Sequence, residues 1–252
     1  MRKIRVFIDN DNLKQDSQIK VEGNDFDYLS KVMRQKIGDK IFIFNGLDGE
    51  FESVISSVEK KFLILDVKEK IANLNKASNI TLAFSLLKNV KIEFIAQKAV
   101  ELGVARIQPI ITQHTIVDKI NVERFKSTIK EALEQCERND FVEVLEIKKL
   151  NKFLDEKNID DKIIILCDES GKGLKASELF TKIKNNDQEI IVLIGPEGGF
   201  SKEEFAKMHL LKNLYSLNLG PRILRADTAV ICALTLTQEF LGDFNLKPCF
   251  RC

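Results

Sequence analysis

The chain has 252 residues, 44% hydrophobic and 31% charged, which excludes a wholly disordered or fibrous protein. Its 39 basic and 38 acidic residues leave a formal net charge of +1, so bulk charge cannot be what attracts nucleic acid. Five cysteines lack the spacing of a disulfide framework, and no uncharged stretch approaches the roughly 20 residues that a membrane span needs. With no secretory signal visible, we expect a soluble cytoplasmic protein that does not bind membranes.

The first part of the chain, residues 1–72, has the pattern of a small β domain. A turn sequence, Asn-Gly-Leu-Asp-Gly over 45–49, separates two strand-like runs, and a helical segment is expected over 25–34. The expected strands cover 40–44, 50–55 and 61–67. Several short strands in so few residues predict a small barrel, and the Asn-rich stretch 71–79 reads as a linker.

From residue 73 to residue 252 strands alternate with helices. We expect strands over 80–86, 104–111, 162–167, 189–194 and 215–219, and helices over 88–102, 121–138, 176–184 and 227–241. A further helix begins at Ser201, where Ser-Lys-Glu-Glu forms a capping box. This alternation predicts a second domain of the α/β class with a mostly parallel sheet.

Two loops follow consecutive strands of that sheet, where α/β folds place ligands. The first, residues 194–200, reads Ile-Gly-Pro-Glu-Gly-Gly-Phe, and its glycines allow the backbone to approach a ligand closely. A plain tight connection explains a lone glycine-rich loop equally well. The loop is neither a dinucleotide fingerprint nor a P-loop, so nucleoside triphosphate binding is unsupported.

The second loop, residues 219–229, carries two arginines just before the last helix. The planar guanidinium of Arg225 suits an oxyanion or a phosphate. The alternative is structural, with Arg222 or Arg225 paired to Glu197 or Asp227 so that the loop is pinned. Because both loops lie at neighbouring strand ends, together they favour a binding site.

Other chemistry is weakly supported. The two histidines have no cluster of metal ligands around them, and no nucleophile motif for covalent hydrolysis is present. Cys249 and Cys252 form one C-x-x-C pair, but zinc needs four ligands, so we expect no metal.

Several co-linear motifs nevertheless match one family. They are the two loops 194–204 and 219–229, the helical segments 88–103 and 131–138, and the N-terminal stretches 5–7 and 32–39. On these residues the chain resembles the RsmE family of 16S rRNA uridine-N3 methyltransferases, in the SPOUT superfamily. There are departures from the family pattern. Asp227 replaces a Glu, which is a mild change, whereas His114-Thr115 replaces Arg-Ser and loses a permanent cation, and a His at Tyr28 and a Pro after Arg138 are missing. These changes bear on the details of RNA contact more than on the cofactor fold.

The resemblance implies a fold and a cofactor. It implies a PUA-like, RNA-binding β-barrel over 1–72, followed by a SPOUT domain over 73–252 whose parallel sheet contains a trefoil knot. The cofactor would be S-adenosylmethionine. The residues implied to bind it are Leu166, Ile194, Gly195, Glu197, Gly198, Gly199, Leu219, Gly220, Ile223, Leu224 and Thr228.

The resemblance also implies a reaction and partners. A methyl group would pass to N3 of a uridine near the 3′ end of 16S rRNA, with Arg225 stabilising charge on the uracil and Glu197 or solvent taking the proton. A homodimer is implied, with the last helix at its interface, and the small ribosomal subunit or free 16S rRNA as partner. The expected RNA contacts are Arg5, Arg34, Lys88, Lys91, Arg124, Arg138 and Arg222.

Two alternatives stay open at this stage. The chain could be a SPOUT methyltransferase that modifies another RNA nucleotide, because the loops constrain the cofactor more than the substrate. It could also be a non-enzymatic RNA-binding or ribosome-assembly protein that keeps the fold, although the intact glycines of both loops argue against a disused pocket.

Overall fold

The computed structural model describes residues 3–10, 12–75, 78–87, 92–168, 170–184 and 187–247. The chain divides into two compact units. The first comprises Met1–Lys76 and Lys130–Phe141, and the second comprises Ala77–Ile129 and Val142–Cys252. Helix α3 (Val122–Gln135) therefore begins in the second unit and ends in the first.

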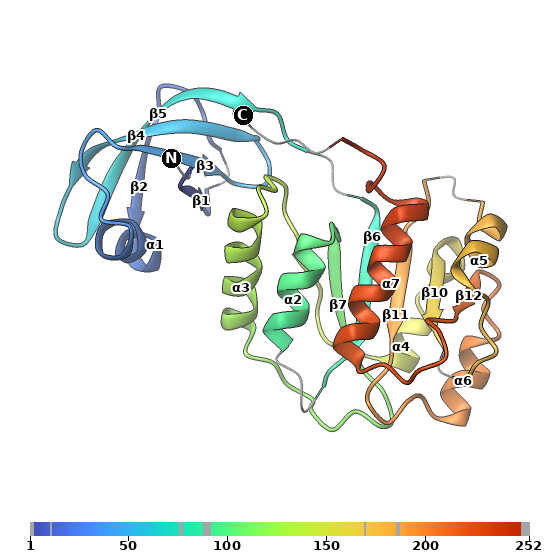
Figure 1. Cartoon of the computed structure of the whole chain (residues 1–252). Coiled ribbons are helices and arrows are strands. Elements are labelled where there is room, and N and C mark those ends of the chain that lie inside the picture. Colours follow the sequence, from blue (N-terminus) through green and yellow to red (C-terminus); the bar gives the residue numbers. More distant parts are fainter. Residues whose placement is uncertain are drawn as a thin grey trace. The chain divides into compact units, whose positions relative to one another are not determined.

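The first unit is a five-stranded sheet of order β1-β3-β4-β5-β2 (Figure 1). Its strands are β1 (Arg5–Phe7), β2 (Gln18–Glu22), β3 (Lys40–Phe44), β4 (Glu50–Val58) and β5 (Phe62–Ala72). Strand β1 is parallel to β3, whereas all other neighbours are antiparallel. The expected short strand over 61–67 is thus longer, and neither β1 nor β2 was among the expected strands.

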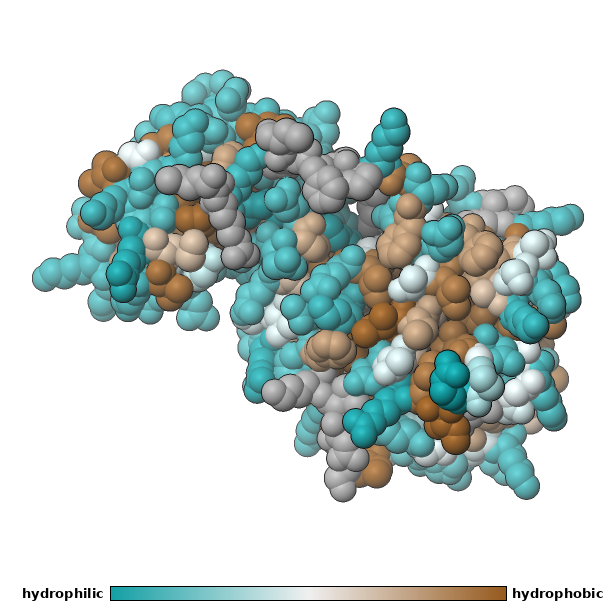
Figure 2. Space-filling view, viewed as in Figure 1, coloured by the Kyte–Doolittle hydropathy of each residue, from teal (hydrophilic) through white to brown (hydrophobic). Residues whose placement is uncertain are grey.

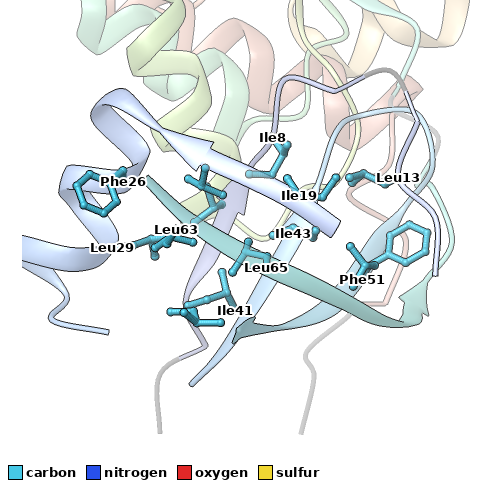
Figure 3. Close-up of a cluster of buried hydrophobic side chains, with 14 residues drawn as sticks. Ile8, Leu13, Ile19, Phe26, Leu29, Ile41, Ile43, Phe51, Leu63 and Leu65 are labelled. Carbon is cyan, nitrogen blue, oxygen red and sulfur yellow. The ribbon is translucent and has the colours of Figure 1, made fainter. Parts of the chain in front are cut away.

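Alternating side chains explain why this sheet curls around a core of its own. In β2 only Ile19 and Val21 are buried, while the polar residues between them are exposed. Figure 3 shows buried side chains from several strands and from the helical segment, among them Phe26 and Leu63, meeting inside the curled sheet. The one helix expected here is two segments, α1 (Gly23–Asp27) and the π-helix η1 (Tyr28–Val32).

The second unit is a parallel α/β sheet, as expected. Its strand path is β12-β10-β11-β6-β7-β8, with β9 also paired to β7, and every pair is parallel. The strands are β6 (Ile80–Ser85), β7 (Arg106–Ile111), β8 (Glu143–Val144), β9 (Lys148–Lys149), β10 (Ile163–Cys167), β11 (Ile190–Ile194) and β12 (Leu214–Leu217). The helices, besides α3, are α2 (Ile92–Glu101), α4 (Leu150–Leu154), the 3-10 turn η2 (Ile159–Asp161), α5 (Ala176–Lys182), α6 (Lys202–Met208) and α7 (Ala226–Leu241).

The two central strands of the sheet are completely buried. Every residue of β6 and β11 is buried, which is typical of parallel strands that carry helices on both faces. Helix α7 crosses the sheet over β11 and packs beside α2 (Figure 1). The short elements β8, β9, α4 and η2 were not expected from the sequence. Because β12, β10 and β11 are parallel neighbours in the sheet, their carboxyl ends lie side by side at one edge, next to the start of α7.

Candidate functional site

A cavity of about 890 Å³ lies at this edge, within the second unit. Its wall is formed by three segments that follow β10, β11 and β12, together with the first turn of α7. Its volume falls in the range of about 300–1,000 Å³ that is usual for small-molecule sites. The residues that line it are Cys167, Asp168, Ser170, Gly171, Lys175, Ala176, Ile194, Gly195, Pro196, Glu197, Gly199, Phe200, Phe205, Asn218, Leu219, Gly220, Pro221, Arg222, Ile223, Leu224, Arg225, Ala226 and Ala229.

The loop after β11 has a fixed shape. The Gly199 amide donates to the Pro196 carbonyl at 2.9 Å, and Gly199 adopts φ +67, which favours glycine. A Cβ at Gly195 would lie 2.8 Å from the Phe200 ring, so only glycine fits there without a shift of that ring. The loop then enters α6 through Ser201, whose hydroxyl accepts from the Glu204 amide at 3.2 Å. The expected capping box is confirmed.

The loop after β12 exposes its cations. Arg222 and Arg225 are both exposed, and neither forms an ion pair with any residue that the structure describes. The structural alternative, in which these arginines pin the loop to Glu197 or Asp227, is therefore not observed. Both arginines line the cavity and keep their guanidinium groups available for an anionic ligand.

A third segment, after β10, was largely missed in the sequence. Asp168 is buried, and its carboxylate accepts from the Ser170 amide at 2.8 Å. Burial raises the pKa of the neighbouring Cys167 thiol, which favours the protonated form of that thiol. The signal that could have indicated both residues is their place at the carboxyl end of a strand next to the other two loops.

Most of the residues expected to bind a cofactor meet around this cavity. Those that line it are Ile194, Gly195, Glu197, Gly199, Leu219, Gly220, Ile223 and Leu224. Three others do not: Leu166 is fully buried within β10, Gly198 is exposed, and Thr228 is exposed in the first turn of α7.

The structure corrects the prediction that Arg5 contacts RNA. Its side chain is 2% exposed and forms an ion pair with Glu50 at 3.0 Å. It also donates to the carbonyl oxygens of Leu133, Glu134 and Arg138, each at 3.0 Å. Every guanidinium nitrogen is thus used inside the first unit, where Arg5 joins the sheet to the end of α3.

The other expected RNA contacts differ in accessibility. Arg34 is exposed, and Arg124 is largely exposed although it pairs with Glu93 at 2.7 Å. Arg138 is mostly buried and holds Asp140 through two nitrogens, at 2.8 and 2.6 Å. Lys88 and Lys91 lie outside the described residues, as do Cys249 and Cys252.

The described part of the chain lacks two features that other functions would need. No helix there is both long and apolar enough to cross a membrane. In the same residues, no three His, Cys, Asp or Glu side chains are grouped so that they could hold a metal ion.

Comparison with known proteins decides the family. Residues 74–238 match the family model of the RNA methyltransferase domain, and residues 21–68 match the RNA methyltransferase PUA domain. The Ribosomal RNA small subunit methyltransferase E of Rickettsia conorii is 31% identical over 236 residues, which cover 93% of this chain and 94% of the relative. The chain belongs to the small subunit methyltransferase E family of RNA methyltransferases.

Solved structures of this methyltransferase family agree with the fold. A Ribosomal RNA small subunit methyltransferase E from Neisseria gonorrhoeae, bound to S-adenosylmethionine, superposes with a TM-score of 0.83 at 27% identity, covering 97% of this chain and 100% of that one. A Legionella pneumophila protein with bound cofactor SAM has the same TM-score at 29% identity, with coverage of 95% and 98%. The N-terminal PUA domain and the parallel α/β sheet are thus both shared.

Proposed function

We propose that this chain transfers a methyl group from S-adenosylmethionine to N3 of one uridine near the 3′ end of 16S rRNA, in the cytoplasm. The observation that supports this most directly is the cavity, because the two loops that carry the family resemblance both line it. Relatives in the family are named for the small ribosomal subunit, and the Neisseria gonorrhoeae protein holds S-adenosylmethionine.

The residues around the cavity suit this cofactor. Ile194, Leu219 and Leu224 supply apolar walls, while the backbone of the glycine-containing loops supplies donors and acceptors for adenine and ribose. The carboxylates of Asp168 and Glu197 suit the positively charged groups of the cofactor. When bound, S-adenosylmethionine supplies an electrophilic methyl group.

Arg225 is the residue proposed to assist the chemistry. Loss of the N3 proton leaves negative charge on the uracil, spread over the neighbouring carbonyl oxygens. This charge disappears as N3 gains the methyl group. An exposed guanidinium at the mouth of the cavity can donate to those oxygens. Either Glu197, also exposed there, or solvent takes the proton. The uridine must be unstacked to enter.

RNA binding is assigned to exposed cations rather than to net charge. We propose Arg34, Arg124 and Arg222, together with Lys88 and Lys91, as contacts to phosphates of 16S rRNA or the small subunit. We leave out Arg5, whose side chain is 2% exposed, and Arg138, whose side chain is 15% exposed and bound to Asp140. A PUA-like domain over 1–72, a catalytic domain over 73–252 and a knot in its sheet remain part of the proposal.

We also propose a homodimer formed through α7. Large apolar side chains are exposed on this helix and in the segments that flank it: Phe240 near its end is 46% exposed, Ile223 before it 94% and Leu246 after it 70%. Apolar residues gather on the face of the molecule that carries α7 (Figure 2). An exposed apolar patch of this kind is typical of a protein–protein interface.

The test is methyl transfer to small ribosomal subunits that lack N3-methyluridine. Labelled S-adenosylmethionine supplies the methyl group, and reverse transcription maps the product, because an N3 methyl blocks the Watson–Crick edge. The proposal expects one new stop near the 3′ end of 16S rRNA. Label at another position would indicate a different RNA target, and no cofactor binding would indicate a non-enzymatic protein.

A further inference from the structure

His114 lies in the loop that follows β7 and contacts the outer side of the loop that follows β11. Its Nδ1 is 3.1 Å from the Gly198 carbonyl oxygen and 3.0 Å from the Gly199 carbonyl oxygen. Both partners are acceptors, so Nδ1 carries the hydrogen and shares it between them. The contact joins loops whose strands are separated by β6 in the sheet.

The loop that carries His114 is itself well fixed. The Thr112 amide donates to the Thr115 hydroxyl at 2.8 Å, and this hydroxyl lies 2.6 Å from that of Ser85 at the end of β6. One residue before His114, the Gln113 amide donates to Glu204 Oε1 at 2.8 Å. Since Glu204 also accepts from the Ser201 amide, two neighbouring contacts tie the β7 loop to the β11 loop.

The two glycines whose carbonyl groups His114 contacts lie on different sides of the β11 loop. Gly198 is exposed, and a Cβ there would lie 3.2 Å from the His114 Cβ, so the histidine packs directly against it. Gly199 is buried and lines the cavity. The shared hydrogen bond therefore acts on the outside of a short piece of backbone whose inside forms the cavity wall.

We propose that His114 is a positioning residue, which holds the Gly198–Gly199 backbone in the conformation that binds S-adenosylmethionine. The inference rests on the proposed function for the identity of the ligand. The contact between His114 and the two glycine carbonyl groups, however, is a property of the free protein. A loop already fixed in its bound conformation loses less conformational freedom on binding, so preorganisation increases affinity.

The size of the effect follows from one shared hydrogen bond at a partly exposed site. Such a bond contributes on the order of 1 kcal/mol, which corresponds to about a fivefold change in affinity. Because His114 is outside the cavity, its loss should weaken cofactor binding without lowering the rate at saturating cofactor.

The experiment compares three variants of the full-length protein. His114→Phe keeps a ring but removes the donor, whereas His114→Asn places an N–H donor at the same distance along the side chain without the ring. His114→Ala removes both. The measurements are hydrogen exchange of the peptide over 195–201 without ligand, S-adenosylmethionine affinity by calorimetry, and KM and kcat for methyl transfer.

We expect the Phe and Ala variants to exchange faster in this peptide and to bind S-adenosylmethionine about three- to tenfold more weakly. KM for the cofactor should rise with kcat unchanged, and Asn should restore most of the wild-type behaviour. Wild-type exchange and affinity in the Phe variant would overturn the proposal, as would equal losses in Asn and Ala. If wild-type protein fails to bind S-adenosylmethionine, the proposed function fails. The exchange data still test whether His114 holds the Gly198–Gly199 backbone.

Discussion

Arg225 is the side chain whose removal should separate catalysis from cofactor binding. It is exposed at the cavity and forms no ion pair within the described residues, so its replacement leaves no buried charge behind. We expect Arg225→Ala to lower kcat by about 10²–10³-fold, the usual loss when one stabilising donor is removed. The affinity for S-adenosylmethionine should change much less, as measured by calorimetry beside single-turnover methyl transfer.

The control for Arg225 is removal of an exposed cation that does not line the cavity. Lys212→Ala, in the loop after α6, should leave kcat within about twofold of wild type. Arg225→Lys should recover only part of the rate, because an ammonium lacks the planar fork of the guanidinium. A fully active Arg225→Ala variant would remove this residue from the mechanism.

Glu134 stands out for a different reason, because its carboxyl is partly buried at the end of α3. Burial raises its pKa to about 7 from the ordinary 4.5, although the Phe7 amide donates to it at 2.9 Å and Lys130 is nearby. The folded protein therefore holds this proton more tightly than the unfolded chain does. Its contribution to stability is fully present below about pH 4.5 and is lost as the pH rises through about 7.

This sign gives a prediction for Glu134→Gln. The amide oxygen of Gln can still accept from the Phe7 amide, and the side chain is uncharged at every pH. At pH 8 the variant should be more stable than wild type by about 1–3 kcal/mol, and near pH 4.5 the difference should largely vanish. Urea unfolding at several pH values measures this, with exposed Glu123→Gln at the start of the same helix as the control. A difference independent of pH would contradict the raised pKa.

Much of the site could be predicted from the residue types at the ends of the strands, but the sequence did not show which side chains are buried. Arg5, in an alternating N-terminal stretch, looks like any surface cation until α3 is seen to cover it. Asp168 follows a predicted strand, but its burial and its place beside the other two loops show only in three dimensions, and His114 lies in a segment without glycine whose contact with the β11 loop no local pattern indicates. Long-range contacts of this kind leave no local signal.

At the scale of elements, helix α6 depends on its capping box. The Ser201 hydroxyl satisfies the Glu204 amide, and the Glu204 carboxylate accepts from the Ser201 amide at 2.9 Å. Both residues are buried, so water cannot replace a lost partner easily. We expect Ser201→Ala to reduce the free energy of unfolding by about 1–2 kcal/mol.

The measurement for the cap is urea unfolding of Ser201→Ala beside Lys202→Ala, which changes an exposed residue at the next position. The Lys202 variant should differ from wild type by less than about 0.5 kcal/mol. Equal stability of Ser201→Ala and wild type would mean that the Glu204 amide finds another partner.

Elements with strong periodicity or clear caps were predictable, and short ones were not. Strand β11 is an unbroken run of buried aliphatic residues, and α6 carries its capping box in the sequence. Strands β8 and β9 are two residues each and exist only because β7 offers an edge, so no pattern of their own could indicate them. The π-helix over Tyr28–Val32 likewise has an ordinary helical composition.

For the whole molecule, the first consequence of the proposal concerns RNA. Arg34 is exposed in the first unit and adopts φ +55, a conformation that Asn tolerates well. We expect Arg34→Asn to weaken binding of 16S rRNA fragments and to reduce the slope of log affinity against log salt by about 0.7–0.9. Filter binding at several salt concentrations measures this. Equal slopes for Arg34→Asn and wild type would exclude a phosphate contact.

The second consequence concerns assembly through α7. In a two-fold dimer each residue of the interface occurs twice, so one substitution on α7 introduces two charges into the same apolar surface. Thr235 is exposed in the middle of this helix, and Thr235→Arg should convert the dimer to a monomer of 28.8 kDa in sedimentation velocity. Ala206→Arg, exposed on α6, is the matched control and should stay dimeric.

Because the loop before α7 lines the cavity, the monomer should also bind S-adenosylmethionine more weakly. A Thr235→Arg dimer would place the interface elsewhere, and a monomeric wild type would contradict the proposed homodimer.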